Sequence, residues 1–248
     1  MSDLPATPGA PPPPTWIDWF DVESVFEDPI SDKHIEVFFR STTPLLKYNS
    51  ADTVLDIGCG RGGLAAALHP RVAAVHCADT SPRYLDLCRR RFERTPNVFT
   101  HSLDPADYTN LSSLPAAHFS IIICLSVIQY YRDVTEVECL IESTRRLAKP
   151  GARLLIADIP ASPGPLGQLA DIAALLRSAT REHCLLPMLQ RLLKMKRSTY
   201  SQTRFTQGLL TLPPATLTAM TNRLNLNAQL LTSPLTLQPN RRHLLIHF

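Results

Sequence analysis

Apolar runs of strand length alternate with amphipathic helical segments along much of the chain, and this pattern restricts the possible folds most strongly. The expected strands are residues 53–57, 72–78, 97–102, 119–125 and 152–158. The expected helices between them are residues 63–69, 81–94 and 134–148. Strands that are apolar throughout and alternate with helices are typical of a parallel sheet covered on both faces. The sequence therefore predicts an α/β protein.

The segments on either side of this core have other patterns. Two helices are expected within residues 15–48, one capped by Thr15 and one starting at Ser31, and we interpret them as an N-terminal helical lid. Residues 160–212 interrupt the alternation and are predicted to form a helical insertion. A helix and two strands end the chain at residues 213–224, 227–232 and 241–248. The turn 238–240 before the last strand indicates a hairpin-like pair, so one strand of the sheet should be antiparallel.

The composition suggests one folded domain in a reducing compartment. Residues 1–14 are rich in proline and are predicted to be a disordered tail, which leaves residues 15–248 as a single domain. The tail has neither the basic start nor the apolar stretch of a secretory signal. The six cysteines have no spacing typical of a metal site, so they are predicted to be buried thiols in a cytoplasmic protein without a metal.

A glycine-rich loop follows the first predicted strand. Four of the nine glycines fall within residues 58–63, and Gly58, Gly60 and Gly63 fit G-x-G-x-x-G. Such a loop indicates that backbone comes close to a ligand. Asp79, at the end of the second strand, fits a ribose contact in either a dinucleotide site or another nucleoside site. Asp56 precedes the loop and would oppose a pyrophosphate, so it favours a ligand with a cationic group, such as S-adenosylmethionine.

Five motifs in order carry a resemblance to a known family: "VLDIGCGRGG", "ADTSP", "NVFTHSLD", "FSIIICLSVIQYY" and "LAKPGARLLIAD". Together they resemble the class I S-adenosylmethionine-dependent methyltransferases of the small-molecule type, close to the group that includes quinone-biosynthesis methyltransferases. The resemblance covers roughly residues 50–160 and the closing helix and strands. It implies a Rossmann-like, mostly parallel sheet of seven strands in the order 3-2-1-4-5-7-6, with the last strand antiparallel and the insertion between strands 5 and 6.

The resemblance also implies roles for the residues at matching positions. Asp56 and the backbone of Gly58, Cys59 and Gly60 would hold the methionine end of S-adenosylmethionine. Asp79 would bind both ribose hydroxyls. The adenine and the floor beneath the methyl group are assigned to the ends of the second, third and fourth strands, at Thr80, Leu103, Asp104, Leu125 and Ser126. Asp104 has a plainer alternative role, which is to cap the turn before Pro105.

The sequence offers several candidates for the catalytic group. Many relatives carry histidines just after strand four, where this chain has Gln129, Tyr130 and Tyr131. Tyr130, Gln129 and His183 are the candidates, although Tyr130 could simply pack. His34 in the lid could also reach the site, but for each of the two histidines an ordinary surface position is the favoured alternative.

The last part of the chain is basic. Residues 183–248 contain eight Lys and Arg and no acidic residue, and Arg191, Lys194 and Arg197 recur at intervals of three. We interpret these three residues as one helix face that attracts an anionic acceptor. The same region, residues 183–204, could meet an acidic carrier protein or a membrane surface, or be only a solvated face.

Three other functions stay open at this point. The chain could be a methyltransferase-like scaffold without catalysis, a nucleic-acid methyltransferase, or an NAD(P)-dependent oxidoreductase. The oxidoreductase is disfavoured by Asp56, and no motif of the DNA-base methyltransferases follows strand four. The prediction is methyl transfer to an O, N or C nucleophile of a small molecule, with no specific nucleic-acid partner.

Overall fold

The structure, a computed structural model, describes residues 15–161 and 164–248. The predicted tail 1–14 lies outside these residues. The seven strands are β1 (Thr53–Ile57), β2 (Ala74–Asp79), β3 (Val98–Ser102), β4 (Phe119–Leu125), β5 (Ala148–Ile159), β6 (Asn227–Leu231) and β7 (Arg242–His247). They form one sheet in the order β3-β2-β1-β4-β5-β7-β6. β7 is antiparallel to both of its neighbours, and the pairs among β1 to β5 are parallel, so the predicted sheet is confirmed.

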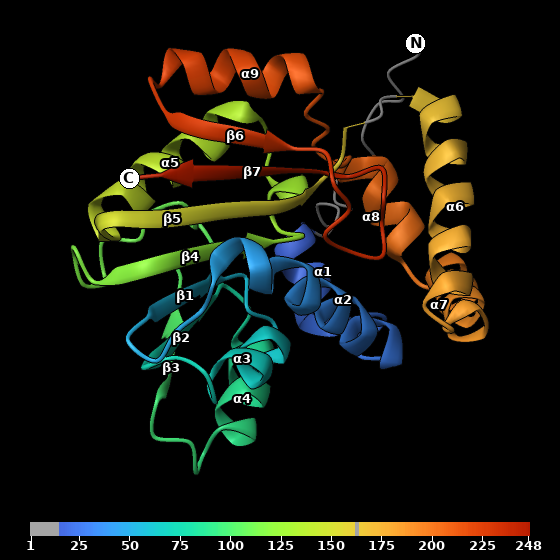
Figure 1. Cartoon of the computed structure of the whole chain (residues 1–248). Helices are drawn as coiled ribbons and strands as arrows, with labels where there is room; N and C mark the ends of the chain where they lie inside the picture. Colours follow the sequence, from blue (N-terminus) through green and yellow to red (C-terminus); the bar gives the residue numbers. More distant parts are fainter. Residues whose placement is uncertain (1–14, 162–163) are drawn as a thin grey trace, which may run out of the picture.

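Helices cover both faces of the sheet (Figure 1). The helices within the described residues are α1 (Trp16–Val22), α2 (Pro29–Leu46), α3 (Gly63–Leu68), α4 (Pro82–Arg91), α5 (Val134–Leu147), α6 (Gly164–Arg181), α7 (Leu185–Arg197), α8 (Tyr200–Gln207) and α9 (Pro214–Arg223), with a short 3₁₀ helix η1 (Ile128–Tyr130). Apolar side chains of α5 and α9 pack on one face of the sheet, and those of α2, α3 and α4 pack on the other. None of these helices has the length and apolar character that a membrane crossing requires.

Local capping explains where several helices begin. Thr15 and Asp18 form a reciprocal capping box at α1, as the sequence predicted for Thr15. Ser81 caps α4, with Pro82 in its first turn. The predicted start of α2 at Ser31 was wrong, because the side chain of Asp28 accepts a hydrogen bond from the Ser31 N–H and Pro29 fits the first helical position.

Three further expectations differ from the structure. β5 begins at Ala148 rather than at residue 152, because its pairing with β4 shifts register between Phe119 and Ile121. The insertion contains a third helix, α8. The connection between β6 and β7 is not a tight turn: residues 232–241 form a long segment in which Leu235, Thr236 and Leu237 are buried. That segment reaches the carboxyl end of β5.

The helices outside the α/β core gather beyond the carboxyl ends of the parallel strands. Figure 1 shows α1, α2, α6, α7 and α8 on that side of the sheet, with the insertion helices α6 and α7 furthest out. Contacts join α1 to α8, and join α7 to α2, α6 and α8. The N-terminal helices and the insertion therefore meet each other above the edge where the glycine loop lies.

Candidate functional site

The glycine loop, Gly58–Gly63, joins β1 to α3. Gly58, Gly60 and Gly62 all have positive φ, a backbone conformation that side chains with a Cβ rarely adopt. A Cβ on Gly58 would lie 2.3 Å from Cγ2 of Val127, so the loop packs directly on the end of β4. Apart from Gly60 itself and its two chain neighbours, no described residue has an atom within 4 Å of the place where a Cβ on Gly60 would stand. The backbone at Gly60 therefore faces open space.

Asp79 holds this loop in place. Its Oδ2 accepts a hydrogen bond from the backbone N–H of Gly60 at 2.8 Å, and its Oδ1 accepts one from Ser81 at 2.9 Å. The side chain is 8% exposed. Burial raises the pKa of Asp79, and the backbone N–H groups that donate to it partly oppose the rise. The sequence predicted a ligand contact for Asp79 but not this bond to the loop.

Asp56 belongs to β1, two residues before the first glycine of the loop. It is buried beside Cys77, its register partner on β2, and its Oδ2 has no hydrogen-bond partner among the described residues. Burial, with smaller contributions from Cys88 and Asp79, raises the pKa of Asp56 to about 8. An unpaired buried carboxyl is costly unless a donor or a cation reaches it.

Three cysteines meet beneath the loop. The Sγ atoms of Cys59, Cys77 and Cys88 lie within 4.8 Å of one another, and all three residues are buried. Thiolates are ligands that suit Zn²⁺, and three is one fewer than a closed tetrahedral site uses. The sequence spacing gave no sign of this cluster, because it joins a loop, a strand and a helix.

A cavity of about 990 Å³ opens beside the glycine loop. Its lining includes most of the predicted site residues, namely Gly58, Cys59, Gly60, Asp79, Thr80, Leu103, Leu125, Ser126, Gln129 and Tyr130. Asp56, Asp104 and His183 are not part of the lining. The structure therefore brings the ends of β1, β2, β3 and β4 to one cavity, as expected for parallel strands.

The side chains of Asp104 and His183 are placed elsewhere. Asp104 is exposed, and its Oδ1 accepts a hydrogen bond from the Ala106 N–H at 2.8 Å, which is the turn-capping role. His183 is exposed in the turn between α6 and α7, with φ 56°. The hypothesis that His183 reaches the reacting atoms does not agree with this position, because His183 is exposed and is not among the residues that line the cavity.

Gln129 is buried and Tyr130 is half-buried in the cavity wall. The Gln129 side chain donates from Nε2 to the carbonyl of Ser126 at 3.1 Å, and its Oε1 accepts from Arg241 at 3.3 Å. The ring of Tyr130 packs 5.0 Å from that of Trp16 and 4.9 Å from that of Phe20, centroid to centroid. Burial raises the pKa of Tyr130 well above its ordinary value, so its hydroxyl stays protonated. Both residues shape the wall.

The N-terminal helix and the insertion build the aromatic side of the cavity. Trp16 of α1 donates from its indole N–H to the carbonyl of Gly208 at 2.9 Å, and Trp19 donates to Thr199 Oγ1 at 3.0 Å. Tyr200 packs against both tryptophans. Because the indoles are hydrogen-bonded to residues at either end of α8, α1 is held against α8 while its residues line the cavity.

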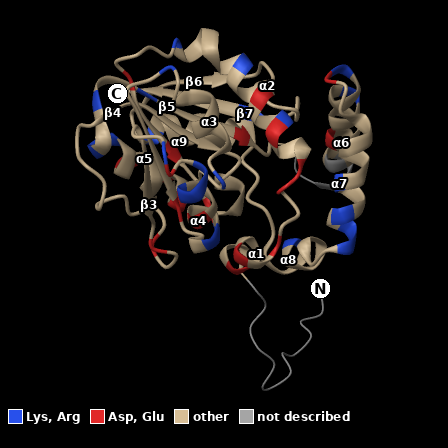
Figure 2. Cartoon of the chain, turned by 90° about the horizontal axis from the view of Figure 1, so that it is seen from below, with Lys and Arg blue, Asp and Glu red and all other residues tan. Residues whose placement is uncertain are grey.

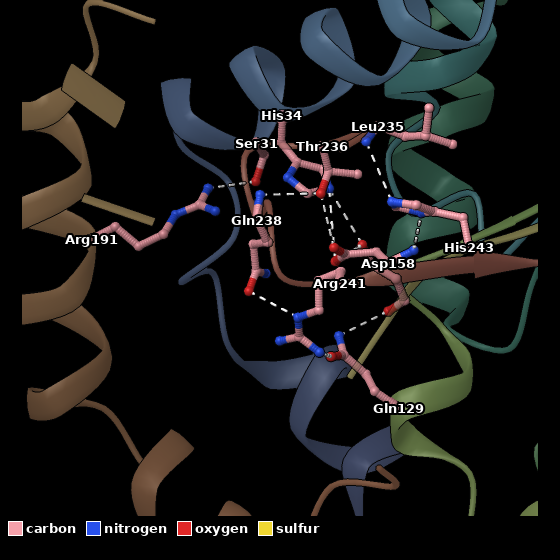
Figure 3. Close-up of polar contacts among 11 residues, drawn as sticks. Ser31, His34, Gln129, Asp158, Arg191, Leu235, Thr236, Gln238, Arg241 and His243 are labelled. Atoms are coloured by element: carbon pink, nitrogen blue, oxygen red, sulfur yellow. Dashed lines mark hydrogen bonds and ion pairs between the residues drawn. The ribbon is translucent and has the colours of Figure 1, made fainter. Parts of the chain in front are cut away.

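A polar network occupies the ends of β4 and β5 (Figure 3). Asp158 Oδ2 accepts from Ser126 Oγ at 2.7 Å, and Oδ1 accepts from Thr236 Oγ1 at 3.0 Å. The imidazole Nε2 of His34 lies 4.0 Å from Oδ2. Burial opposes the ionisation of Asp158, but Arg241, His34 and the two hydroxyls outweigh it and hold its pKa below the ordinary value.

Sequence reasoning missed Asp158, Thr236 and Arg241 as parts of this site. Asp158 ends the run "LLIAD" of the fifth strand, so its place at the carboxyl edge was a usable signal. Thr236 and Arg241 lie in the connection between β6 and β7, and no local pattern indicated that this segment folds back over β5.

The basic face predicted for α7 is partly neutralised. Arg191 forms an ion pair with Asp28, donating from Nε to Oδ2 at 2.8 Å, and the Nζ of Lys194 donates to the carbonyl of Ser24 at 3.0 Å. Asp28, from the N-terminal segment, therefore balances the charge of Arg191, the first of the three residues expected to attract an anionic acceptor.

Comparison with known proteins agrees with this geometry. Residues 54–151 match the family described as a methyltransferase domain. The chain is 29% identical over 119 residues to a demethylmenaquinone methyltransferase of Tropheryma whipplei (strain Twist), covering 48% of this chain and 46% of that protein. It is 33% identical over 128 residues to chondramide synthase cmdD of Chondromyces crocatus, covering 50% of this chain and 3% of that protein. The chain thus spans less than half the length of either relative.

A solved structure supports the fold over almost the whole chain. This structure is the magnesium protoporphyrin IX methyltransferase (ChlM) from Synechocystis PCC 6803 with bound S-adenosylhomocysteine. Its sequence is 16% identical to this chain, and the TM-score is 0.55. The aligned region covers 93% of this chain and 96% of that chain. At this identity the likeness concerns the fold. Residues 54–151 of this chain therefore match the methyltransferase-domain family, and the chain shares the Rossmann-like fold of this solved methyltransferase structure.

Proposed function

We propose that the chain transfers a methyl group from S-adenosylmethionine to a nucleophile on a small, largely apolar acceptor. The observation that carries the proposal is the single cavity in which the open backbone of Gly60 and the carboxylate of Asp79 face an aromatic wall that includes Trp16, Phe20 and Tyr200. A nucleoside cofactor and a ring-containing acceptor would fit on opposite sides of it.

The residues around the glycine loop suit this cofactor. The bound cofactor would supply a methyl carbon activated by a sulfonium. Asp79 would accept hydrogen bonds from the ribose hydroxyls, with Thr80 and Leu103 beside the adenine. Leu125 and Ser126 would lie under the methyl group. The unpaired Oδ2 of Asp56 would gain a partner in the ammonium of the methionine part.

The pH dependence of cofactor binding tests the role of Asp56. Since the pKa of Asp56 is raised to about 8, most of this carboxyl is protonated at pH 6 to 7 and must ionise to pair with an ammonium. Affinity for S-adenosylhomocysteine should therefore rise between pH 6 and 7.5, approaching tenfold per unit. Calorimetry in two buffers of different ionisation enthalpy should detect the released proton.

Asp56→Asn is the matched control for this experiment, because it keeps the shape and removes the proton. The variant should bind without proton release and with little dependence on pH. The same raised pKa makes the protein without ligand less stable as pH rises from about 4 to 8, since the unfolded chain ionises first. Proton release of equal size in Asp56→Asn would contradict the assignment.

The acceptor side of the cavity favours a small molecule with a large apolar part. The wall includes Phe26, Tyr130 and Met188, while polar groups converge at the ends of β4 and β5. Apolar walls with a few placed polar groups are typical of small-molecule sites. A single-stranded nucleic acid would instead need a positively charged groove that follows its phosphate backbone.

A ligand panel separates the proposed function from its alternatives. Calorimetry with S-adenosylmethionine, S-adenosylhomocysteine, NAD and NADP should give binding only for the first two. If the protein binds NAD alone, it is better explained as an oxidoreductase. If it binds none of the four ligands, a scaffold without catalysis is the better explanation. Labelled S-adenosylmethionine incubated with small phenols, amines and thiols would then identify the methylated atom.

We also propose that α7 touches an anionic membrane surface. Leu186, Leu189 and Leu193 recur along one side of α7 and are 67%, 41% and 56% exposed. Lys196 and Arg197 are exposed at its end, and Figure 2 shows basic residues along this outer helix. Exposed leucines beside basic residues are typical of helices that lie on membrane surfaces.

Vesicle sedimentation tests this contact. The protein should sediment with vesicles that contain phosphatidylglycerol, less so in high salt, and not with pure phosphatidylcholine. Leu189→Glu with Leu193→Glu should abolish sedimentation without changing cofactor affinity. Sedimentation with neither vesicle type would contradict the membrane contact, and an acidic carrier protein or a merely solvated face would then be the alternatives for this surface.

A further inference from the structure

Two neighbouring strands end in residues with unusual backbone angles whose side chains meet. Ser126, after β4, has φ 59°, and Asp158, near the end of β5, has φ 68°. Side chains with a Cβ persist in this left-handed region only where surrounding contacts hold them, and such positions cluster at functional sites. Here the Ser126 N–H donates to the carbonyl of Ala157 at 3.0 Å and the Ser126 hydroxyl donates to Asp158.

His34 of α2 reaches the same point from the other side of the cavity. Its Nε2 lies 3.4 Å from Ser126 Oγ. The helix that carries it is held against the glycine loop, since Ile35 lies 3.2 Å from where a Cβ on Gly63 would stand and Asp32 pairs with Arg61 at 2.7 Å. The imidazole therefore lies between the loop and the end of β5, and it lines the cavity.

The contacts of His34 favour one neutral form of the ring. Nε2 faces Ser126 Oγ, whose proton is directed to Asp158, so Nε2 carries the hydrogen and Nδ1 keeps the free electron pair. No described residue forms a hydrogen bond with Nδ1. In this form of the ring, Nδ1 is able to act as a base and accept a proton from a molecule in the cavity.

The charges around the ring come from several elements. The carboxylate of Asp158 on β5 lies 4.0 Å from Nε2, and Arg191 of α7 and Arg241 before β7 act on the ring as positive charges. Burial lowers the pKa of His34, the two arginines lower it further, and Asp158 opposes them. His243 of β7 lies behind Asp158, and burial lowers its pKa to about 4, so it adds no charge. The ring is neutral at pH 7.

We infer that His34 is the catalytic base of the proposed methyl transfer, and that Asp158 acts through Ser126 to position it. The inference rests on the proposed function. As an acceptor X–H attacks the methyl carbon, the X–C bond forms, the C–S bond breaks and its electron pair stays on sulfur. The proton of X–H passes to Nδ1 of His34, and the carboxylate of Asp158 stabilises the imidazolium. Such a base typically contributes 10²- to 10⁴-fold.

Nuclear magnetic resonance of ¹⁵N-labelled histidine tests the ring directly, without any turnover. In the free protein His34 should be neutral at pH 7 with its hydrogen on Nε2. Ser126→Ala should reduce that preference, and Asp158→Asn should lower the pKa of His34, because Asp158 is the group that raises it. A ring protonated at pH 7, or one with its hydrogen on Nδ1, overturns the inference.

Kinetics of His34→Gln with two probe acceptors test the base function. 2-Naphthol and 2-naphthalenethiol have the same ring, but the thiol ionises more readily and needs a base less. The variant should lose at least about 100-fold in kcat with the naphthol and less than about tenfold with the thiol. Its affinity for S-adenosylhomocysteine should stay within about twofold, because His34 contacts the acceptor side of the cavity.

His247→Gln is the matched control, since His247 is exposed at the opposite end of β7 and has no place in the site. It should behave as the wild-type protein with both probes. Equal losses with naphthol and thiol, or no loss with either, overturn the inference. A wild-type protein that does not bind S-adenosylhomocysteine overturns the proposed function instead, so the two failures are distinguishable.

Discussion

Replacing Asp79 by alanine is expected to weaken the binding of S-adenosylhomocysteine at least tenfold. The ribose hydroxyls would lose the carboxylate that accepts their hydrogen bonds, and a hydrogen bond to a charged group contributes about 1.5–3 kcal/mol. The change would also leave the N–H groups of Gly60 and Ser81 without their acceptor, so the melting temperature should fall. Calorimetry with the purified variant measures the affinity, and Asp79→Asn separates the loss of charge from the loss of the loop contact.

Asp104→Ala is the matched control for Asp79→Ala. Asp104 follows β3 at the same edge of the sheet, but it is exposed and accepts only from Ala106. Its replacement should change the affinity by no more than about twofold, because surface positions away from special contacts have small effects. An unchanged affinity in Asp79→Ala would refute the ribose contact. A loss in Asp104→Ala as large as that in Asp79→Ala would restore Asp104 as an adenine ligand.

Gly60→Val is expected to abolish cofactor binding while the protein stays folded. The valine side chain would project into the open space beside Gly60, where the cofactor would lie. Holding a valine at φ +53° costs on the order of 1–3 kcal/mol, a fraction of the stability of a typical domain. Calorimetry and circular dichroism on the same sample would show lost binding with a near-native spectrum.

Gly151→Val provides a control for backbone strain. Gly151 has φ +78°, and within the described part of the chain only its own atoms and its chain neighbours lie within 4 Å of where its Cβ would stand. It belongs to the first residues of β5, however, at the opposite end from the cavity. Both variants should therefore lose similar stability, and only Gly60→Val should lose the cofactor. Normal affinity in Gly60→Val would mean that the loop binds something else.

The sequence was sufficient to predict the sheet and the side of the cavity that includes the glycine loop. Strand and helix periodicity is local, so β1 to β4 and their helices could be assigned with small errors at the ends. Parallel strands joined by right-handed crossovers bring their carboxyl ends to one edge. Gly58, Asp79 and Ser126 therefore had to come together, whatever the rest of the chain did.

The acceptor side of the cavity depended on the tertiary structure. His34 and Asp158 are far apart in sequence, as are Asp28 and Arg191, and no period or motif relates them. Their contacts depend on how the N-terminal helices, the insertion and the connection between β6 and β7 pack against one another, which is decided by side chains from several segments at once. The sequence by itself determined the α/β sheet and the place of the cofactor loop, and only the tertiary structure decided which side chains face it across the cavity.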